Sequence, residues 1–286
     1  MSRRLIILGC VIIYCLCFPV ITVDAKALGY WAFNTKNELG EDSSPFGNDG
    51  EVKGAGTAEW IAKGKVGGGL KLSNGWLEVP HDDSLNVKDQ ITLMCWVQFS
   101  GDGDPFGATG RDQSLVWKNG PFATNKRFWT SYALRVWRRH TKFGSFGFDA
   151  NLVGGRSAAA DPDFPDAGDA DKTWYHIAGV ADGTEVRIYT DGKEKKAAPQ
   201  RGEFQSTDLP LTIGYDLRPG LLAGREFFLG IIDEVVIVDK ALTEAEIKGA
   251  MELGENGKSL EGFNPVFAVE PEGKLATQWG EIKAGK

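Results

Sequence analysis

The stretch Ile91-Thr-Leu93-Met-Cys95-Trp-Val97-Gln-Phe99 decides the fold, because it alternates in the way that a strand of a packed sheet does. Successive side chains of a strand point to opposite faces, so every second residue of this stretch shares one face. That face is wholly apolar, and we expect it to pack in the interior. Its one thiol, Cys95, is therefore predicted to be a buried structural residue and not a reactive one.

Composition and turn residues around this stretch indicate many short strands. Glycine makes up 37 of the 286 residues and tryptophan nine, a balance that suits strands and tight turns more than helices. Asn74-Gly75 predicts a two-residue hairpin between strands at 69–72 and 76–79. Asp182-Gly183 and Asp191-Gly192 predict further turns. Short strands at even spacing predict an all-β fold, a sandwich or a barrel.

One helix is expected, near the C-terminus. Thr243-Glu-Ala-Glu246 is a capping box, in which the hydroxyl and the carboxylate satisfy free N–H groups at a helix start. The pattern predicts a short helix that ends at Gly254, the glycine that follows the last helical turn. Residues 254–286 then form a mixed tail, and its apolar residues predict that part of it docks on the domain.

The N-terminal segment, residues 1–25, is typical of a secretory signal peptide. Arg3 and Arg4 precede an apolar run, and small or short residues favour cleavage after Ala25. A retained membrane anchor is the main alternative, because the run is just long enough to span a bilayer, and a lipid-modified Cys10 is another. Cleavage leaves Cys95 as the one cysteine, which excludes an intramolecular disulfide. We expect a secreted or cell-envelope-associated protein, integral to a membrane only if the segment is retained.

Several short motifs resemble one known family by their order and spacing. They are Gly29-Tyr-Trp-Ala-Phe33, Asp42-Ser-Ser-Pro-Phe-Gly-Asn48-Asp-Gly50, Trp76-Leu-Glu-Val-Pro80, Trp174-Tyr-His-Ile-Ala178, Ile231-Ile-Asp-Glu-Val235 and Ala241-Leu-Thr-Glu-Ala-Glu-Ile247. Together they resemble the laminin-G-like, concanavalin A-like lectin/glucanase jelly-roll family found in secreted bacterial proteins. The resemblance covers residues 27–253 and implies two antiparallel sheets stacked as a sandwich, with one concave face. It implies no single function, because members include glycan binders, enzymes and adhesion modules.

The sequence does not show the carboxylate pair that glycosidases of this superfamily carry on one strand, as Glu-x-Asp-x-Glu or Glu-x-Asp-x-x-Glu. The nearest run begins at Asp233-Glu234, whose side chains point to opposite faces, and reaches the next acid only at Asp239. His176 lies in no nucleophile motif and is expected to be structural. We therefore predict a protein that is not an enzyme, with a glycoside hydrolase or lyase as the third-ranked function.

The loop at residues 41–50 concentrates hard oxygen ligands and flexible glycines, which suits Ca²⁺. In similar domains such an ion clips this loop to the last strand. The resemblance implies Asp42, the carbonyls near Gly47 and Asn48, and Asp233 as ligands of a structural calcium. The alternative is that Asp42 caps a turn and residues 48–50 form a hairpin turn.

A basic segment, residues 118–142, holds seven lysines and arginines and no acid, within a chain of net charge −7. The acidic chain as a whole excludes a general nucleic-acid binder, which needs a positive surface. Guanidinium groups pair with anions, and indole rings stack on sugars, so the segment suits sulfated or uronic-acid glycans. The ligand-binding residues expected from alternation and spacing are Arg135, Trp137, Arg139 and Trp129.

The alternative for this segment is a solvated sheet face whose cations balance acids such as Asp161, Asp163, Asp166, Asp169 and Asp171. On balance the sequence predicts a secreted, lectin-like module that binds a glycan or glycoprotein, with anionic glycans and a structural calcium as the finer expectation. A non-catalytic adhesion or structural module that recognises protein is the main alternative.

Overall fold

Thirteen strands, two short 3₁₀ helices and one α-helix make up the described part of this computed structural model. It describes residues 25–99, 112–120, 130–138, 144–162, 173–217 and 227–260. The helices are η1 (Lys36–Glu38), η2 (Asp83–Leu85) and α2 (Glu244–Glu255). The strands are β1 (Ala27–Trp31), β2 (Glu51–Ile61), β3 (Gly69–Val79), β4 (Gln90–Phe99), β5 (Gln113–Asn119), β6 (Thr130–Arg138), β7 (Gly144–Leu152), β8 (Gly155–Ala160), β9 (Trp174–Asp182), β10 (Glu185–Thr190), β11 (Lys193–Pro199), β12 (Leu211–Ile213) and β13 (Gly230–Val238).

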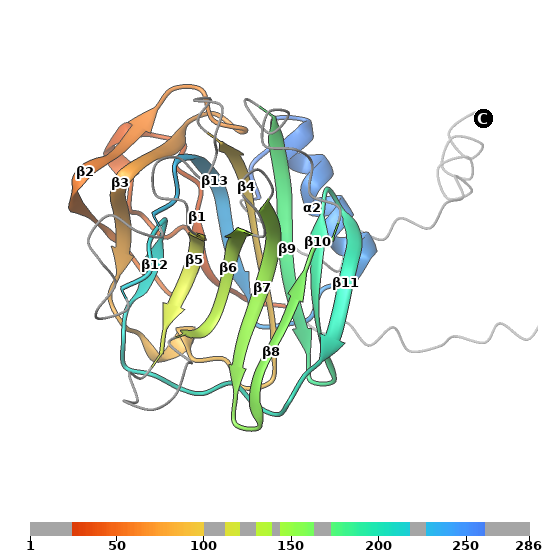
Figure 1. Cartoon of the computed structure of the whole chain (residues 1–286). Coiled ribbons are helices and arrows are strands. Elements are labelled where there is room, and N and C mark those ends of the chain that lie inside the picture. Colours follow the sequence, from red (N-terminus) through yellow and green to blue (C-terminus); the bar gives the residue numbers. More distant parts are fainter. Residues whose placement is uncertain are drawn as a thin grey trace, which may run out of the picture.

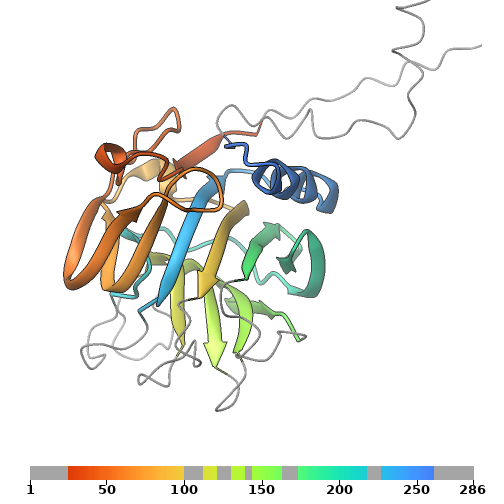
Figure 2. The same cartoon turned by 90° about the horizontal axis from the view of Figure 1, so that it is seen from above.

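The strands form two antiparallel layers that stack face to face. Hydrogen bonds link them in the order β11-β10-β9-β4-β13-β3-β12-β5-β6-β7-β8, with β1 added at β13 and β2 at β3. This path bends over on itself, so β9 and β10 pack against β7 and β8 without pairing with them (Figure 1). Seen from above, the layer with β3, β13 and β4 covers the layer with β5 to β8 (Figure 2). The predicted antiparallel β-sandwich with one short C-terminal helix is confirmed.

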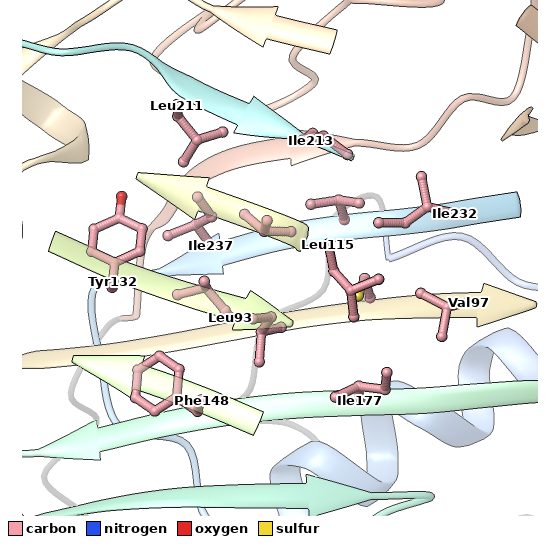
Figure 3. Close-up of a cluster of buried hydrophobic side chains, with 14 of the residues drawn as sticks. Leu93, Val97, Leu115, Tyr132, Phe148, Ile177, Leu211, Ile213, Ile232 and Ile237 are labelled. Carbon is pink, nitrogen blue, oxygen red and sulfur yellow. The ribbon is translucent and has the colours of Figure 1, made fainter. Parts of the chain in front are cut away.

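The main core fills the space between the two layers (Figure 3). Leu93 and Val97 of β4 meet Leu115 of β5, Tyr132 of β6 and Phe148 of β7 there. Each residue on the predicted interior face of β4 is at most 2% exposed, and Cys95 is among them. The alternation predicted for β4 is therefore confirmed.

Asn74-Gly75 does not turn the chain, so the hairpin predicted there is wrong. β3 runs through it as one strand, and Thr57 of β2 pairs with both Ser73 and Asn74. Two residues opposite one make a β-bulge, and Asn74 has a φ of 59°. A type I′ turn and a bulge both use an Asn-Gly pair for its positive φ. The pairing with the long strand β2 selects the bulge. The sequence did not predict β2 as a strand, because its residues are mostly exposed and include glycines.

The other two predicted turns are confirmed. Asp182-Gly183 joins β9 to β10, and Gly183 has a φ of 92°. Asp191-Gly192 joins β10 to β11 with φ values of 50° and 70°. Positive φ at both central residues is what a tight hairpin turn between twisted strands requires.

Helix α2 begins as predicted but ends later. The Thr243–Glu246 capping box is complete, with both reciprocal hydrogen bonds present. The helix continues to Glu255, and the positive φ that ends it belongs to Gly257, at 66°. Gly254 therefore lies inside the helix. It is a glycine because a Cβ there would collide with the indole of Trp96 on β4. The prediction that Gly254 ends the helix is wrong, since the position is set by packing on the sheet.

Helix α2 and the segment after it cover the outer face of the layer that contains β1, β13, β4 and β9. A second apolar cluster lies beneath them and includes Met94, Val180, Ile247 and Leu260. The Leu260 N–H donates to Glu234 Oε2 at 2.8 Å, and the Tyr30 hydroxyl donates to the same oxygen at 2.7 Å. The described start of the tail is therefore docked, and residues 261–286 lie outside the described part.

Residues 1–24, nearly all of the predicted signal segment, also lie outside the described residues. Among the residues that are described, no helix is long and apolar enough to cross a membrane.

Candidate functional site

The outer face of β6 carries the side chains that the sequence singled out. Leu134 and Val136 point into the core, while Arg135 and Trp137 lie on the opposite face. In the ladder, Ala133 stands between Trp117 of β5 and Asp149 of β7, so these side chains share the outer face of β6. The predicted placement of Arg135 and Trp137 on one face is confirmed. The side chain of Arg138 is not described, and the predicted site residues Arg139 and Trp129 lie outside the described residues.

Asp149 is the centre of an ion-pair cluster on this face. Its Oδ2 lies 2.7 Å from Nε of Arg135, and its Oδ1 accepts a 2.7 Å hydrogen bond from Nε of Arg156 on β8. A second guanidinium nitrogen of Arg156 also contacts Oδ1. Arg135 Nη1 lies 3.3 Å from Oδ2 of Asp112. Two arginines thus meet two carboxylates, and we call Arg135, Trp137, Asp149, Arg156 and Asp112, with Trp117, the arginine–tryptophan cluster.

Trp137 lies close to both arginines of this cluster. The guanidinium carbons of Arg135 and Arg156 are 4.8 Å and 5.3 Å from its ring centroid, within the range of cation–π attraction. A Cβ at Gly147 would be 3.2 Å from the indole, so this glycine lets the ring lie close to β7. The residue is half-buried, and among the described residues its Nε1 has no hydrogen-bond partner. A buried donor without a partner is costly.

The sequence did not identify Asp149, Arg156 or Trp117 as members of this site. The signal for Asp149 was present, because the core residues Phe146 and Phe148 alternate with it along β7. Its pairing with Arg156 required knowledge of the β7–β8 hairpin. Of the acids proposed as the balancing charges, Asp161 accepts a 2.7 Å hydrogen bond from Thr190, and Asp163, Asp166, Asp169 and Asp171 lie outside the described residues.

Lys118, in the basic segment, is not part of the exposed basic surface expected from the sequence. Its Nζ donates to the Leu209 carbonyl at 2.6 Å and lies 3.3 Å from Nδ1 of His81. Burial lowers the pKa of Lys118 to about 8, because it removes water from the ammonium group. Counting charges along the sequence therefore overstates the positive surface of this segment.

A second aromatic cluster, absent from the sequence predictions, lies on the same sheet face near β3 and β12. The rings of Tyr215 and Phe227 stack with centroids 4.1 Å apart, and Trp76 lies 4.8 Å from Tyr215. Trp76 Nε1 donates to Glu78 at 3.3 Å. Glu78 of β3 pairs with Thr212 of β12, and Thr212 pairs with Trp117 of β5. Side chains at paired positions lie on the same face of a sheet, so this aromatic cluster and the arginine–tryptophan cluster share a face.

The predicted calcium loop is held together by its own hydrogen bonds. Oδ1 of Asp42 accepts from the N–H groups of Tyr30 and Ser44, at 2.7 and 2.8 Å. Oδ2 of Asp42 accepts from the Ser44 hydroxyl and from the Asn48 N–H, at 2.7 and 2.6 Å. The structure therefore brings Asp42 and Asn48 together, with Gly47 between them at a φ of 63°. The carboxylate is used to organise the loop, as in the alternative that the sequence left open.

Asp233, the fourth predicted ligand, is bonded to a different segment. Its Oδ2 accepts from the N–H groups of Lys65 and Val66, at 2.8 and 2.9 Å, and its Oδ1 accepts from the Glu234 N–H. Burial raises the pKa of Asp233 to about 8. Among the described residues, no three His, Cys, Asp or Glu side chains converge as metal ligands. An open hollow of about 490 Å³ does lie beside the loop, lined by Glu38, Glu41, Asp42 and Asp49.

His176 and Cys95, which the sequence predicted to be structural, are both buried. His176 is buried on β9 with its ring 5.1 Å from that of Trp96, and burial lowers its pKa to about 3. Cys95 is buried, and burial raises the pKa of its thiol well above the usual range. Neither side chain is available as a nucleophile or base near neutral pH.

Comparisons with known proteins show where this architecture belongs. Residues 71–248 match the laminin G family model of the concanavalin A-like lectin/glucanases superfamily. Domain 4 of AbnA, an extracellular arabinanase of Geobacillus stearothermophilus solved with arabinotriose, is 18% identical and has a TM-score of 0.56, over 79% of this chain and 98% of that one. The binding domain of Paraclostridial Mosquitocidal Protein 1 is 13% identical with a TM-score of 0.56, over 79% of this chain and 52% of that one.

A third solved structure is the ligand-binding domain of botulinum neurotoxin serotype D with N-acetylneuraminic acid. It is 13% identical with a TM-score of 0.53, over 81% of this chain and 50% of that one. The chain spans about half the length of the two toxin structures, and identities this low show a shared fold alone. No curated protein sequence matches the chain. The family model covers most of the domain, and the chain belongs to the concanavalin A-like lectin/glucanases superfamily.

Proposed function

We propose that this chain is a non-catalytic carbohydrate-binding module that holds a sugar at the arginine–tryptophan cluster. The observation that carries the proposal is Trp137, a half-buried indole close to two guanidinium groups, with a buried Nε1 that has no hydrogen-bond partner among the described residues. A flat ring beside fixed donors and acceptors is what a sugar needs, since its C–H face stacks and its hydroxyls form hydrogen bonds.

The arrangement of the carboxylates supports binding without catalysis. Glycoside hydrolysis needs one carboxylic acid that protonates the leaving oxygen and a second carboxylate on the other side of the bond. In the cluster, Asp149 and Asp112 both face Arg135, and Asp149 also faces Arg156. Asp233 and Glu234 are buried and bonded to neighbouring N–H or hydroxyl groups. None of these acids is presented to a bound sugar as a proton donor.

The solved structures add a second line of support. The arabinanase domain was solved with arabinotriose and the neurotoxin domain with N-acetylneuraminic acid, so this architecture accommodates both an uncharged and an acidic sugar. We propose a glycan or glycoprotein partner outside the cell, in line with the signal peptide that the sequence predicts at residues 1–25. Recognition of a protein surface by an adhesion module is the competing function.

The decisive experiment is a glycan array with the purified protein, followed by calorimetry with the best ligand. We expect binding that Trp137→Ala weakens about tenfold or more, as for an aromatic side chain at the centre of an interface. Trp60→Ala is the matched control, because Trp60 lies on β2, outside the cluster. Binding to no glycan by a protein with a cooperative thermal transition would reject the proposal and favour the adhesion module.

A structural calcium at the 41–50 loop is the second part of the proposal. The acidic hollow beside the loop supports it, whereas the hydrogen bonds of Asp233 argue against a ligand from the last strand. An ion that binds only the folded state raises the melting temperature. We expect millimolar CaCl₂ to raise it, EDTA to reverse the rise, and Glu41→Gln to reduce it. Equal melting temperatures in CaCl₂ and EDTA would remove calcium from the proposal.

A further inference from the structure

We infer that Asp149 makes this site select uncharged sugars, by neutralising the two arginines that would otherwise attract an anion. The inference rests on the proposed function, since it concerns the same cluster. It departs from the sequence, in which the basic segment predicted sulfated or uronic-acid glycans. The described side chains of the cluster carry two positive and two negative charges, so they present no net charge to a ligand.

The geometry shows how fully the arginines are engaged. Each carboxylate oxygen of Asp149 faces a different arginine: Oδ2 faces Arg135, and Oδ1 faces Arg156. The Asp149 side chain is only 3% exposed, so solvent screens these pairs weakly. Arg135 is held further by Asp112 at 3.3 Å and lies over Trp117, with the guanidinium carbon 5.9 Å from the ring centroid. These contacts fix the guanidinium groups in place before any ligand arrives.

An anionic sugar must therefore compete with the carboxylate of Asp149, which already contacts both arginines. A sulfate or carboxylate needs the forked N–H donors of an arginine. Asp149 already accepts a hydrogen bond from Nε of Arg156, and its other oxygen lies 2.7 Å from Nε of Arg135. The ligand would also approach two carboxylates, whose like charge repels it. An uncharged sugar meets neither cost, because it uses the ring of Trp137 and hydrogen bonds that remain at the edge of Arg156. Arg156 is the more open of the two arginines, at 39% side-chain exposure against 13% for Arg135.

Neutralising Asp149 tests the inference directly. The probes are dextran and dextran sulfate of equal length, titrated by calorimetry at 50 and 500 mM NaCl, beside the best uncharged ligand from the array. We expect Asp149→Asn to bind dextran sulfate about tenfold more tightly than the unmodified protein does at low salt, and to lose this gain at high salt. Asp149→Asn with Arg156→Gln restores neutrality and should abolish the gain.

Two further variants keep the test interpretable. Glu59 on β2 forms a surface ion pair with Lys71 on β3, so Glu59→Gln makes the same charge change and controls for a general effect of net charge. Asp112→Asn replaces the more exposed partner of Arg135, and it tests the inference if Asp149→Asn lacks a cooperative thermal transition. Equal dextran sulfate affinity in Asp149→Asn, Asp112→Asn and Glu59→Gln overturns the inference.

The two proposals fail in different ways. Binding of sulfated or uronic glycans by the unmodified protein, weakened by salt and by Trp137→Ala, would reject selection against anions and keep the carbohydrate function. Absence of any glycan binding by the unmodified protein would reject the carbohydrate function. A sulfate-binding gain confined to Asp149→Asn and Asp112→Asn would still show that these carboxylates neutralise the arginines.

Discussion

The two outer faces of the sandwich are built differently. The face formed by β1, β13, β4 and β9 is covered by α2 and the segment up to Leu260, and its side chains are mainly apolar. The Tyr30 hydroxyl on this face donates to Glu234 and accepts from the Leu260 N–H. The face formed by β6, β7 and β8 instead carries paired charges around a half-buried Trp137. The first face is completed by the chain itself, whereas the second has a half-buried ring whose Nε1 has no hydrogen-bond partner among the described residues.

Removing apolar packing from the helix-covered face should have the largest effect on stability. Ile247 of α2 is fully buried against that face, so Ile247→Ala should lower the free energy of unfolding by about 2–4 kcal/mol. Urea denaturation measures the loss. Lys248→Ala, at an exposed position of the same helix, is the control and should change stability by less than about 0.5 kcal/mol. Similar losses in both variants would show that α2 does not cover the sheet as described.

Lys118 tests where the charges of the basic segment lie. Its pKa is about 8 in the folded chain against an ordinary 10.5, so the buried ammonium opposes folding below pH 8. As the pH rises from 8 through 10.5, the folded chain releases this proton first, and stability rises by up to about 3 kcal/mol. Urea denaturation at pH 7.5 and 10 should show this rise for the unmodified protein relative to Lys118→Met. Parallel pH dependence in the two proteins would contradict burial of the amine.

The Tyr30 hydroxyl tests the attachment of the tail. Tyr30→Phe leaves Glu234 Oε2 and the Leu260 N–H without this buried partner, and should cost about 1–3 kcal/mol in the free energy of unfolding. Glycan affinity should not change, because Tyr30 lies on the helix-covered face. Tyr215→Phe, in the second aromatic cluster, is the control for loss of a tyrosine hydroxyl. A change of glycan affinity in Tyr30→Phe alone would mean that the two faces are coupled.

Arg156 should give the smallest change in stability. Its side chain is 39% exposed and Asp149 keeps its contact with Arg135, so Arg156→Ala should cost less than about 1 kcal/mol. Binding should fall about tenfold, because the ring of Trp137 loses its contact with the Arg156 guanidinium group. Denaturation and calorimetry on the same preparation separate the two effects. A large loss of stability without a loss of binding would make the cluster structural.

Prediction from the sequence worked where the deciding interaction is local. The alternation of β4 predicted its buried face, because the period of a strand is built into the backbone. Asp191-Gly192 and the Thr243 capping box were predicted correctly, since their hydrogen bonds and φ values involve only neighbouring residues. For the site, alternation placed Arg135 and Trp137 on one face, as the structure has them.

By itself, then, the sequence determined the all-β class, several of the strands, two of the three predicted turns, the helix start and the family. The tertiary structure decided how these local elements pair and pack against one another. Asn74-Gly75 lies in a bulge because β2 pairs with β3 on both sides of it, and position 254 is a glycine because Trp96 lies against the helix there. Asp149 met Arg135 and Arg156 only because three strands lie side by side. A contact between distant residues depends on how the layers stack, and no local pattern of residues encodes that geometry.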